Sequence, residues 1–198
     1  MRTYALIAVV CAVILVANFA SAQQADVMLG GGTLLSSSPQ TATQDQTVIA
    51  EKGAPYPSAS ADIILFRRYG LNVEGAWKWK DGYYPGYEQG YRPILVDGNV
   101  LFQPRLSRKF GIDLMVGAGA ESVRFYSPAT SSCPYASCTT FFSNSHFMEH
   151  LGGGIRYYFY RHLYVRPEVH YYHIHNNTEF NSDNVVRAGA SVGYTFGR

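Results

Sequence analysis

Apolar and polar residues alternate along eight segments of the chain, which is the pattern of a β-strand with one apolar and one polar face. The segments cover residues 25–35, 58–66, 71–80, 91–103, 110–125, 146–159, 162–172 and 185–196. In the third, LNVEGAWKWK, the apolar face holds Leu71, Val73, Gly75, Trp77 and Trp79, and the polar face holds Asn72, Glu74, Lys78 and Lys80. Each segment is long enough to cross a bilayer at a tilt.

The connections between these segments are alternately short and long. The turns RRYG, PRLSRK and YRH join the second segment to the third, the fourth to the fifth and the sixth to the seventh. Residues 36–57, 81–90, 126–145 and 174–183 form long connections rich in Ser, Thr, Pro, Asn, Gly and Tyr. Short turns at one end and long polar loops at the other are typical of a transmembrane β-barrel, with periplasmic turns and extracellular loops.

The seventh segment, HLYVRPEVHYY, raises the question of which of its faces meets water. Within a bilayer every backbone N–H and C=O must be paired internally, so only helices and closed barrels can span it. In a barrel of this kind the apolar faces meet lipid and the charged faces line the interior, which side chains fill when there are about eight strands. We therefore predict an all-β fold, an antiparallel up-and-down transmembrane β-barrel of about eight strands.

The predicted interior carries a polar network with charges of both signs. Its members are Glu74, Asp97, Asp113, Glu121, His150, Arg156, Arg166, Glu168, His170 and Arg187. A tight turn near Tyr160 is expected to place His150 beside His170. The neighbouring hairpins are expected to bring Glu121 near His150, and Arg187 near Glu168 or His170. We interpret the network as structural, because paired carboxylates and guanidinium groups can fill the interior and fix the strand register.

Pro167 is the exception within the seventh segment, because proline cannot donate a ladder hydrogen bond. The sequence therefore predicts a bulge or bend at Pro167. The neighbouring run Gly152–Gly153–Gly154 is expected to relieve that bend by letting the two backbones approach.

The first 22 residues are typical of a cleaved secretory signal. Arg2 supplies the positive charge, residues 6–16 form the apolar run, and Ala20–Ser21–Ala22 gives a small-residue cleavage site. The barrel domain is then expected to cover residues 23–198. An uncleaved membrane anchor is the alternative, although the apolar run is short for a span. In an exported protein Cys133 and Cys138, within CPYASC, are expected to form a local disulfide rather than a metal site.

Aromatic residues are abundant, with 16 Tyr and 11 Phe, and many stand near the ends of the alternating segments. Such residues form girdles at the two interfaces of outer-membrane barrels. Interfacial or lipid-facing positions are expected for Trp77, Trp79, Tyr157, Tyr171, Tyr194 and Phe196. The net charge of +2 is too small to indicate nucleic acid as a partner.

The segments VGAGAESVRF (116–125) and RAGASVGYTF (187–196) resemble the small eight-stranded outer-membrane barrels of the OmpA/OmpX type. The resemblance covers essentially the whole chain after the expected signal. It implies that the last strand, where Val192, Tyr194 and Phe196 alternate with smaller residues, is read by the outer-membrane barrel assembly machinery. Such signals normally end on an aromatic residue, whereas Gly197 and Arg198 follow Phe196 here.

The stretch HYYHIHNN (170–177) has two functional interpretations, a catalytic site and a metal site. It looks like the His-x-Ser-Asn motif of lipid A deacylase barrels, with His173 as the base and Glu179 as a candidate acid. The nucleophile position is His175, so the acyl-enzyme mechanism lacks its hydroxyl. Alternatively, His146 would join His173 and His175 as metal ligands at the extracellular rim. We favour interfacial histidines without a metal.

The sequence thus predicts a non-catalytic outer-membrane protein without a cofactor. Its partners are expected to be the lipid bilayer of the outer membrane, the assembly machinery and an extracellular ligand bound by the loops, above all loop 126–145. A secreted soluble β-barrel that binds a partner is the remaining alternative. It would need a second sheet to cover the apolar residues Leu71, Val73, Trp77, Trp79, Ile94, Val96 and Val100.

Overall fold

The computed structural model describes residues 24–36, 51–83, 90–126, 141–180 and 182–197. The expected signal peptide (1–22) and the expected disulfide between Cys133 and Cys138 lie outside these ranges. All elements within them are β-strands. The described chain has no helix that is both long enough and apolar enough to cross a membrane.

Eight long strands and one two-residue strand follow one another along the chain. Their bounds are β1 Gln24–Ser36, β2 Gly53–Phe66, β3 Tyr69–Trp77, β4 Gly82–Tyr83, β5 Gly90–Phe102, β6 Phe110–Tyr126, β7 Phe141–Tyr160, β8 Leu163–Ile174 and β9 Asn184–Phe196.

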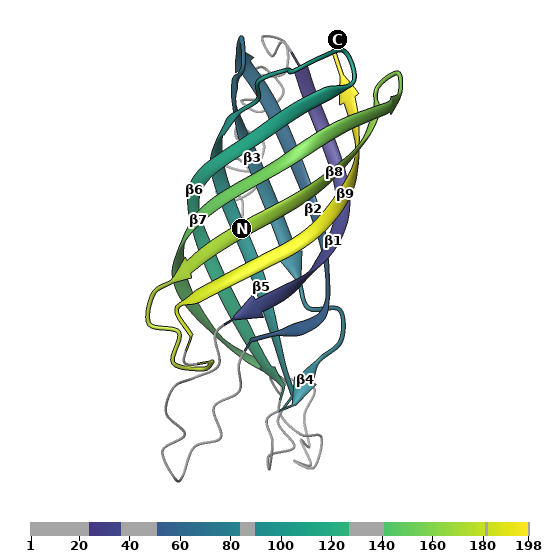
Figure 1. Ribbon diagram of the computed structural model, residues 1–198. Helices are drawn as coiled ribbons and strands as arrows, with labels where there is room; N and C mark the ends of the chain where they lie inside the picture. The colour runs from purple at the N-terminus through teal and green to yellow at the C-terminus, as the bar shows by residue number, and fades with distance from the viewer. Residues whose placement is uncertain (1–23, 37–50, 84–89, 127–140, 181, 198) are drawn as a thin grey trace, which may run out of the picture.

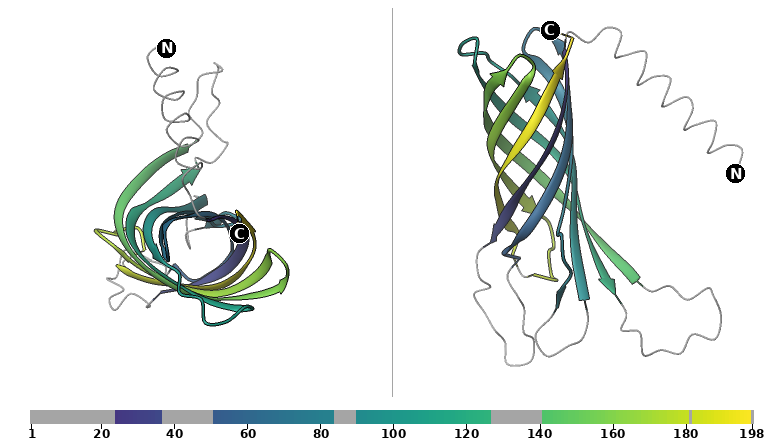
Figure 2. Two further views of the ribbon diagram at one scale, coloured as in Figure 1. Left: turned by 90° about the horizontal axis from the view of Figure 1, so that it is seen from above. Right: turned by 90° about the vertical axis from the view of Figure 1, so that its right-hand side faces the viewer.

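The strands form one closed antiparallel barrel (Figures 1 and 2). Neighbours in the sequence pair with each other, and the first strand closes onto the last, from Ala25 opposite Phe196 to Ser36 opposite Val185. The short β4 pairs with β5, and β3 pairs directly with β5 in the barrel wall. The predicted antiparallel barrel of eight long strands is confirmed.

Two strands, β2 and β7, begin five residues earlier than the alternation predicts, whereas the other long strands begin within two residues of the predicted start. β2 starts at Gly53, and its extra residues pair with β1 around a register shift between Gly32 and Leu34. β7 starts at Phe141 and pairs with the end of β6, and its first five residues are all exposed although Val123 and Phe125 on β6 are buried. Neither extension shows an apolar–polar alternation, since prolines interrupt the first and no core face exists in the second. Pairing with a neighbouring strand therefore extends both beyond the sequence pattern.

The bulge expected at Pro167 is not present. Gly154 pairs with Glu168 and Tyr157 with Val165 in one unchanged register, and the register shift lies instead beside the turn at Tyr160. Pairing toward β7 is interrupted next to Pro167, while pairing toward β9 continues through it. Gly154 leaves room for the side chain of Arg166, because a Cβ on Gly154 would lie 2.8 Å from Cγ of Arg166.

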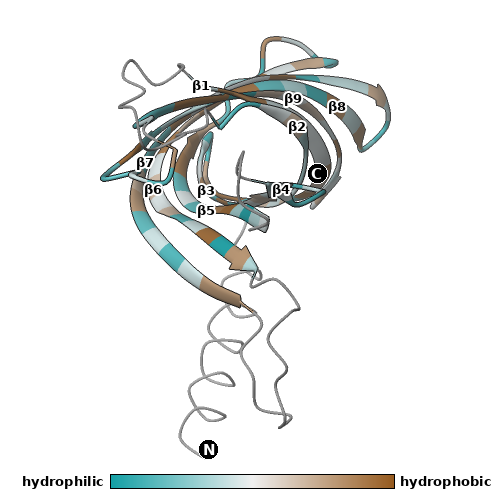
Figure 3. Ribbon diagram, turned by 90° about the horizontal axis from the view of Figure 1, so that it is seen from below, coloured by the Kyte–Doolittle hydropathy of each residue, from teal (hydrophilic) through white to brown (hydrophobic). Residues whose placement is uncertain are grey.

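The outward faces of the strands are apolar over most of their length, with charged exceptions at Arg124 on β6 and Glu149 on β7. Exposed aliphatic side chains recur at every second position, including Leu71, Val73, Val96, Val100, Leu114, Val116, Leu151 and Val192. Figure 3 shows the resulting alternation of apolar and polar residues along the strands. No second sheet of the described chain covers this surface. It is therefore suited to contact with hydrocarbon rather than with water.

Val116 tests this assignment, because it lies near the middle of β6, opposite Val100 and Leu151, with its side chain 57% exposed. We expect Val116→Arg to destabilise the folded protein in phospholipid vesicles by about 2–4 kcal/mol, since a cation is costly at the bilayer midplane. The measurement is a urea titration of vesicle-folded protein.

Leu106→Arg is the matched control, because Leu106 is exposed in the turn between β5 and β6. Its expected effect is within about 0.5 kcal/mol. Equal effects of the two substitutions would show that the outer face of β6 does not lie in hydrocarbon.

Candidate functional site: the ion-pair network in the barrel interior

The inward positions of the strands gather polar side chains in the centre of the barrel. All ten residues predicted for the interior network are buried, each with at most 4% of its surface exposed. They come from β3, β5, β6, β7, β8 and β9, and β1 and β2 add Asp26 and Asp62. The site is therefore built from every long strand of the barrel.

Arg156 on β7 is the centre of one half of the network. Its guanidinium pairs with Asp26 on β1 and Asp62 on β2, and its Nε donates to Oδ2 of Asp113 on β6 at 2.6 Å. The same group lies 4.5 Å from the ring centroid of Tyr164. One cation thus contacts carboxylates from three other strands, which ties opposite sides of the wall together.

Two further arginines continue the network along the interior. Arg166 donates through Nε to Oε2 of Glu168 at 2.7 Å and through Nη1 to Oδ2 of Asp113 at 3.1 Å. Arg187 on β9 pairs with Glu74 and lies 3.5 Å from Oε1 of Glu168. The expected neighbourhood of Arg187 and Glu168 is therefore present.

A pair of histidines occupies the neighbouring layer. Nε2 of His150 lies 2.9 Å from Nδ1 of His170, and the rings stack with centroids 5.1 Å apart. Nδ1 of His150 lies 2.6 Å from Oδ1 of Asn99 and 3.3 Å from Oδ1 of Asp97. Gly152 makes space for the pair, because a Cβ there would lie within 3.0 Å of both imidazoles.

Glu121 does not lie beside His150 as expected. The β6–β7 ladder places His150 opposite Gly117 and places Glu121 opposite His146, four residues nearer the long loops. Oε2 of Glu121 instead accepts from Nδ2 of Asn177 at 3.2 Å. The sequence estimate failed because the register of this hairpin is set along the full length of β7, including the extension that the alternation does not mark.

Residues that the strand pattern did not indicate are buried at the loop end of the interior. Glu51, Asn177 and Phe180 are buried, although none of them belongs to a strand. Burial raises the pKa of the Glu51 carboxyl, and this effect outweighs the lowering by hydrogen bonds with Glu121 and Tyr56. Phe180 packs against Tyr91 with ring centroids 5.3 Å apart. Irregular segments carry no periodicity, so no sequence signal marks these residues as buried.

The three rim histidines do not form a common site. His146 faces inward, where its Nε2 lies 2.8 Å from Oε2 of Glu179. His173 and His175 lie on the outer side, with ring centroids 4.8 Å apart, and they contact Asn184 and Glu149. Strand alternation thus separates His146 from the other two. Because Glu179 pairs with His146, it is also not positioned as the acid partner of His173 in a deacylase-like arrangement.

The six aromatic residues predicted for the girdle are all exposed on the outside of the barrel. Tyr157, Tyr194 and Phe196 lie near the short turns, whereas Trp77, Trp79 and Tyr171 lie toward the long loops. Tyr194 and Phe196 pack edge to face with centroids 4.7 Å apart. Further exposed aromatic residues accompany both groups, namely Phe66, Tyr69, Phe110 and Tyr160 near the turns, and Tyr83, Phe141, Phe142 and Phe147 near the loops.

The fold is that of small outer-membrane barrels. Searches with protein-family models and against curated proteins give no match. Among solved structures the chain is similar to the attachment invasion locus protein Ail of Yersinia pestis, with 12% identity over 87% of this chain and 98% of that one and a TM-score of 0.56. It is similar to Neisserial surface protein A, with 12% identity, coverages of 87% and 96% and a TM-score of 0.58. It is also similar to the outer membrane protein OprG of Pseudomonas aeruginosa, with 12% identity, coverages of 90% and 98% and a TM-score of 0.53.

The network can be tested at its most connected cation. Arg156→Met would leave Asp26, Asp62 and Asp113 buried with less compensation, so we expect a loss of about 3–5 kcal/mol in the free energy of unfolding. The measurement is urea unfolding in one detergent, with the migration of unboiled samples in SDS gels reporting the folded fraction.

Arg108→Met makes the same chemical change at an exposed position in the turn between β5 and β6. We expect it to alter the free energy of unfolding by less than about 0.5 kcal/mol. Losses of the same size in the two variants would show that the interior pairing does not depend on Arg156.

Proposed function

We propose that this protein is a non-catalytic integral outer-membrane barrel whose interior is filled by side chains and whose long loops form a recognition surface outside the cell. The observation that carries the proposal is the interior itself. Each of its charged residues is almost fully buried and most are ion-paired with residues of other strands, which suits a structural plug rather than a pore or an active site.

The connections at the two ends of the barrel differ in length, which supports an orientation with the long loops outside the cell. The turns between β2 and β3, β5 and β6, and β7 and β8 are short, while the connections at the opposite end are long. In outer-membrane barrels the short turns face the periplasm and the long loops face the outside. Ail, a barrel of similar fold, has been crystallised in complex with the heparin analogue sucrose octasulfate, which is a precedent for ligand binding by a small barrel.

The remaining parts of the proposal concern export and assembly. Residues 1–22 act as a cleaved signal peptide, and Cys133 and Cys138 form a disulfide that stiffens loop 126–145. The last strand, with Val192, Tyr194 and Phe196 on its outer face, is read by the barrel assembly machinery. The interior network of Arg156, Arg166, Arg187 and their carboxylates fixes the strand register.

An epitope inserted at each end of the barrel tests the orientation that this function needs. We expect an epitope after Lys80, in the exposed segment following β3, to bind antibody on intact cells, because that segment lies at the long-loop end. An epitope after Ser107, in the turn between β5 and β6, should bind only after the outer membrane is permeabilised. Staining of the Ser107 variant on intact cells, with none for Lys80, would contradict the proposal.

A further inference from the structure

A chain of hydrogen bonds across the barrel fixes which atoms donate and which accept. Nδ2 of Asn72 donates to Oδ1 of Asp62 at 2.6 Å, because a carboxylate can only accept. Oδ1 of Asn72 then accepts from Nδ2 of Asn99 at 2.7 Å, and Nδ2 of Asn99 also donates to Asp97. Two carboxylates therefore fix the orientation of the Asn99 amide, whose Oδ1 is left as an acceptor.

The orientation of Asn99 determines the tautomers of both histidines. Oδ1 of Asn99 accepts from Nδ1–H of His150, so Nε2 of neutral His150 carries a lone pair. That lone pair accepts from Nδ1–H of His170 at 2.9 Å. Since neutral imidazole has one N–H, the lone pair of His170 is on Nε2. The relay thus fixes which nitrogen of His170 is free to bind a further group.

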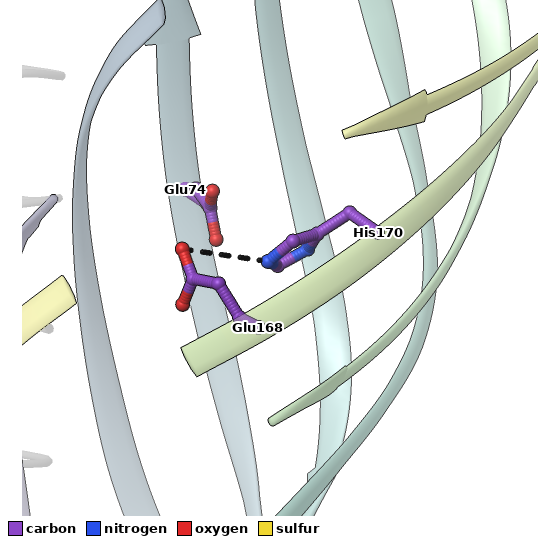
Figure 4. Close-up of side chains that lie close together, drawn as sticks. All are labelled: Glu74, Glu168 and His170. Atoms are coloured by element: carbon purple, nitrogen blue, oxygen red, sulfur yellow. Dashed lines mark ion pairs between the residues drawn. The ribbon is translucent and has the colours of Figure 1, made fainter. Parts of the chain in front are cut away.

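Nε2 of His170 lies next to the carboxylate of Glu168, which can only accept. It lies 3.6 Å from Oε1 of Glu168, and within the part of the chain that the structure describes neither this nitrogen nor Oε2 of Glu74 has a hydrogen-bond partner. Figure 4 shows the three side chains converging from β3 and β8. One atom from each of Glu74, Glu168 and His170 lies within 4.8 Å of the others, and all three residues are buried. Buried lone pairs without a donor are costly, so this arrangement calls for a cation between them.

The balance of charges in the interior also favours a bound cation. Between the two ends of the barrel the described chain buries six carboxylates, of Asp26, Asp62, Glu74, Asp97, Asp113 and Glu168, against the three guanidinium groups of Arg156, Arg166 and Arg187. Arg187 pairs with Glu74 and Glu168 from β9, while Oε2 of Glu74 and Nε and Nη1 of Arg187 have no hydrogen-bond partner among the described residues. Negative charge remains after all three arginines have been counted.

We propose that Glu74, Glu168 and His170 bind one divalent transition-metal ion of the zinc class inside the barrel. One imidazole and two carboxylates form a ligand set that suits such ions, and two ligands on a tetrahedral zinc lie about 3.4 Å apart, close to the 3.6 Å between His170 and Glu168. Metal-bound histidines usually donate their other N–H to a fixed acceptor. His170 does so toward His150, at the end of the relay from Asp62.

Metal retention by the folded chain tests this proposal. The chain isolated from outer membranes is unfolded in urea and folded again in detergent with Zn²⁺, and free metal is then removed on a chelating resin. We expect about one zinc per chain, as a single site requires. Because the site is buried, folding in the presence of Zn²⁺ avoids slow entry. Mg²⁺, which prefers all-oxygen ligands, should not be retained.

The variants separate this site from other histidines and from misfolding. His170→Gln should retain at least about tenfold less zinc, while His173→Gln, on the outer side, should retain as much as the native chain. Glu74→Gln is a second variant that keeps an acceptor for Arg187 and should also lose zinc. Retention is compared only among samples that show the folded migration in SDS gels.

Nitrogen NMR of His170 gives an independent measurement. With zinc bound, Nε2 should have the shift of a metal ligand and Nδ1 that of a protonated nitrogen. A native chain folded with Zn²⁺ that retains none would overturn the proposal, as would equal retention by the native chain and His170→Gln. Protonation of Nε2 in the zinc-treated protein would likewise overturn it, because a proton would then occupy the position proposed for the metal.

Discussion

Backbone N–H and C=O groups in hydrocarbon find no water, and each unpaired group costs several kcal/mol. The pairing of β1 with β9 removes the last free edge, and the other features of the structure follow from this closure. In a closed wall with side chains at a period of two, one half of the residues must face lipid and the other half a narrow interior. Most charged residues of the strands therefore lie at inward positions, where they need partners from other strands.

The interior pairing has a second consequence, for register. Arg156 contacts carboxylates on β1, β2 and β6, so a slip of one residue in any of these hairpins would separate it from a partner. The same slip would turn that strand's charges toward lipid. Buried ion pairs add little to stability when complete, because desolvation offsets the attraction, but breaking one is costly. The network therefore acts more on the choice of register than on the total free energy of folding.

Alternation in the sequence was enough to assign faces but not neighbours. In HLYVRPEVHYY the inward positions of Arg166, Glu168 and His170 follow from the period of two alone. Which side chains meet across the interior depends on register and on barrel shear, and for this reason Glu121 was placed beside the wrong partner. The expectation that His146 lies near His173 and His175 failed for a related reason. His146 points inward from β7, whereas His173 points outward from β8.

Irregular segments were the least predictable part of the site. Glu51 and Phe180 are buried at the loop end of the interior, yet their segments have no repeating pattern that would mark them as buried. The hydrogen-bond relay from Asp62 to His170 was equally hidden, because it joins strands that are distant in sequence through asparagine amides. Asparagine at an inward position is compatible with many partners, so only the three-dimensional arrangement assigns its role.

The central claim is that ion-paired side chains fill the interior of a barrel that spans the membrane. Planar-bilayer recording of the purified barrel tests it most directly, with an open porin in the same bilayer as a positive control. The account predicts no steady conductance above that of the bare membrane, because buried side chains, most of the charged ones ion-paired, fill the interior. A reproducible channel of constant single-channel conductance would contradict it.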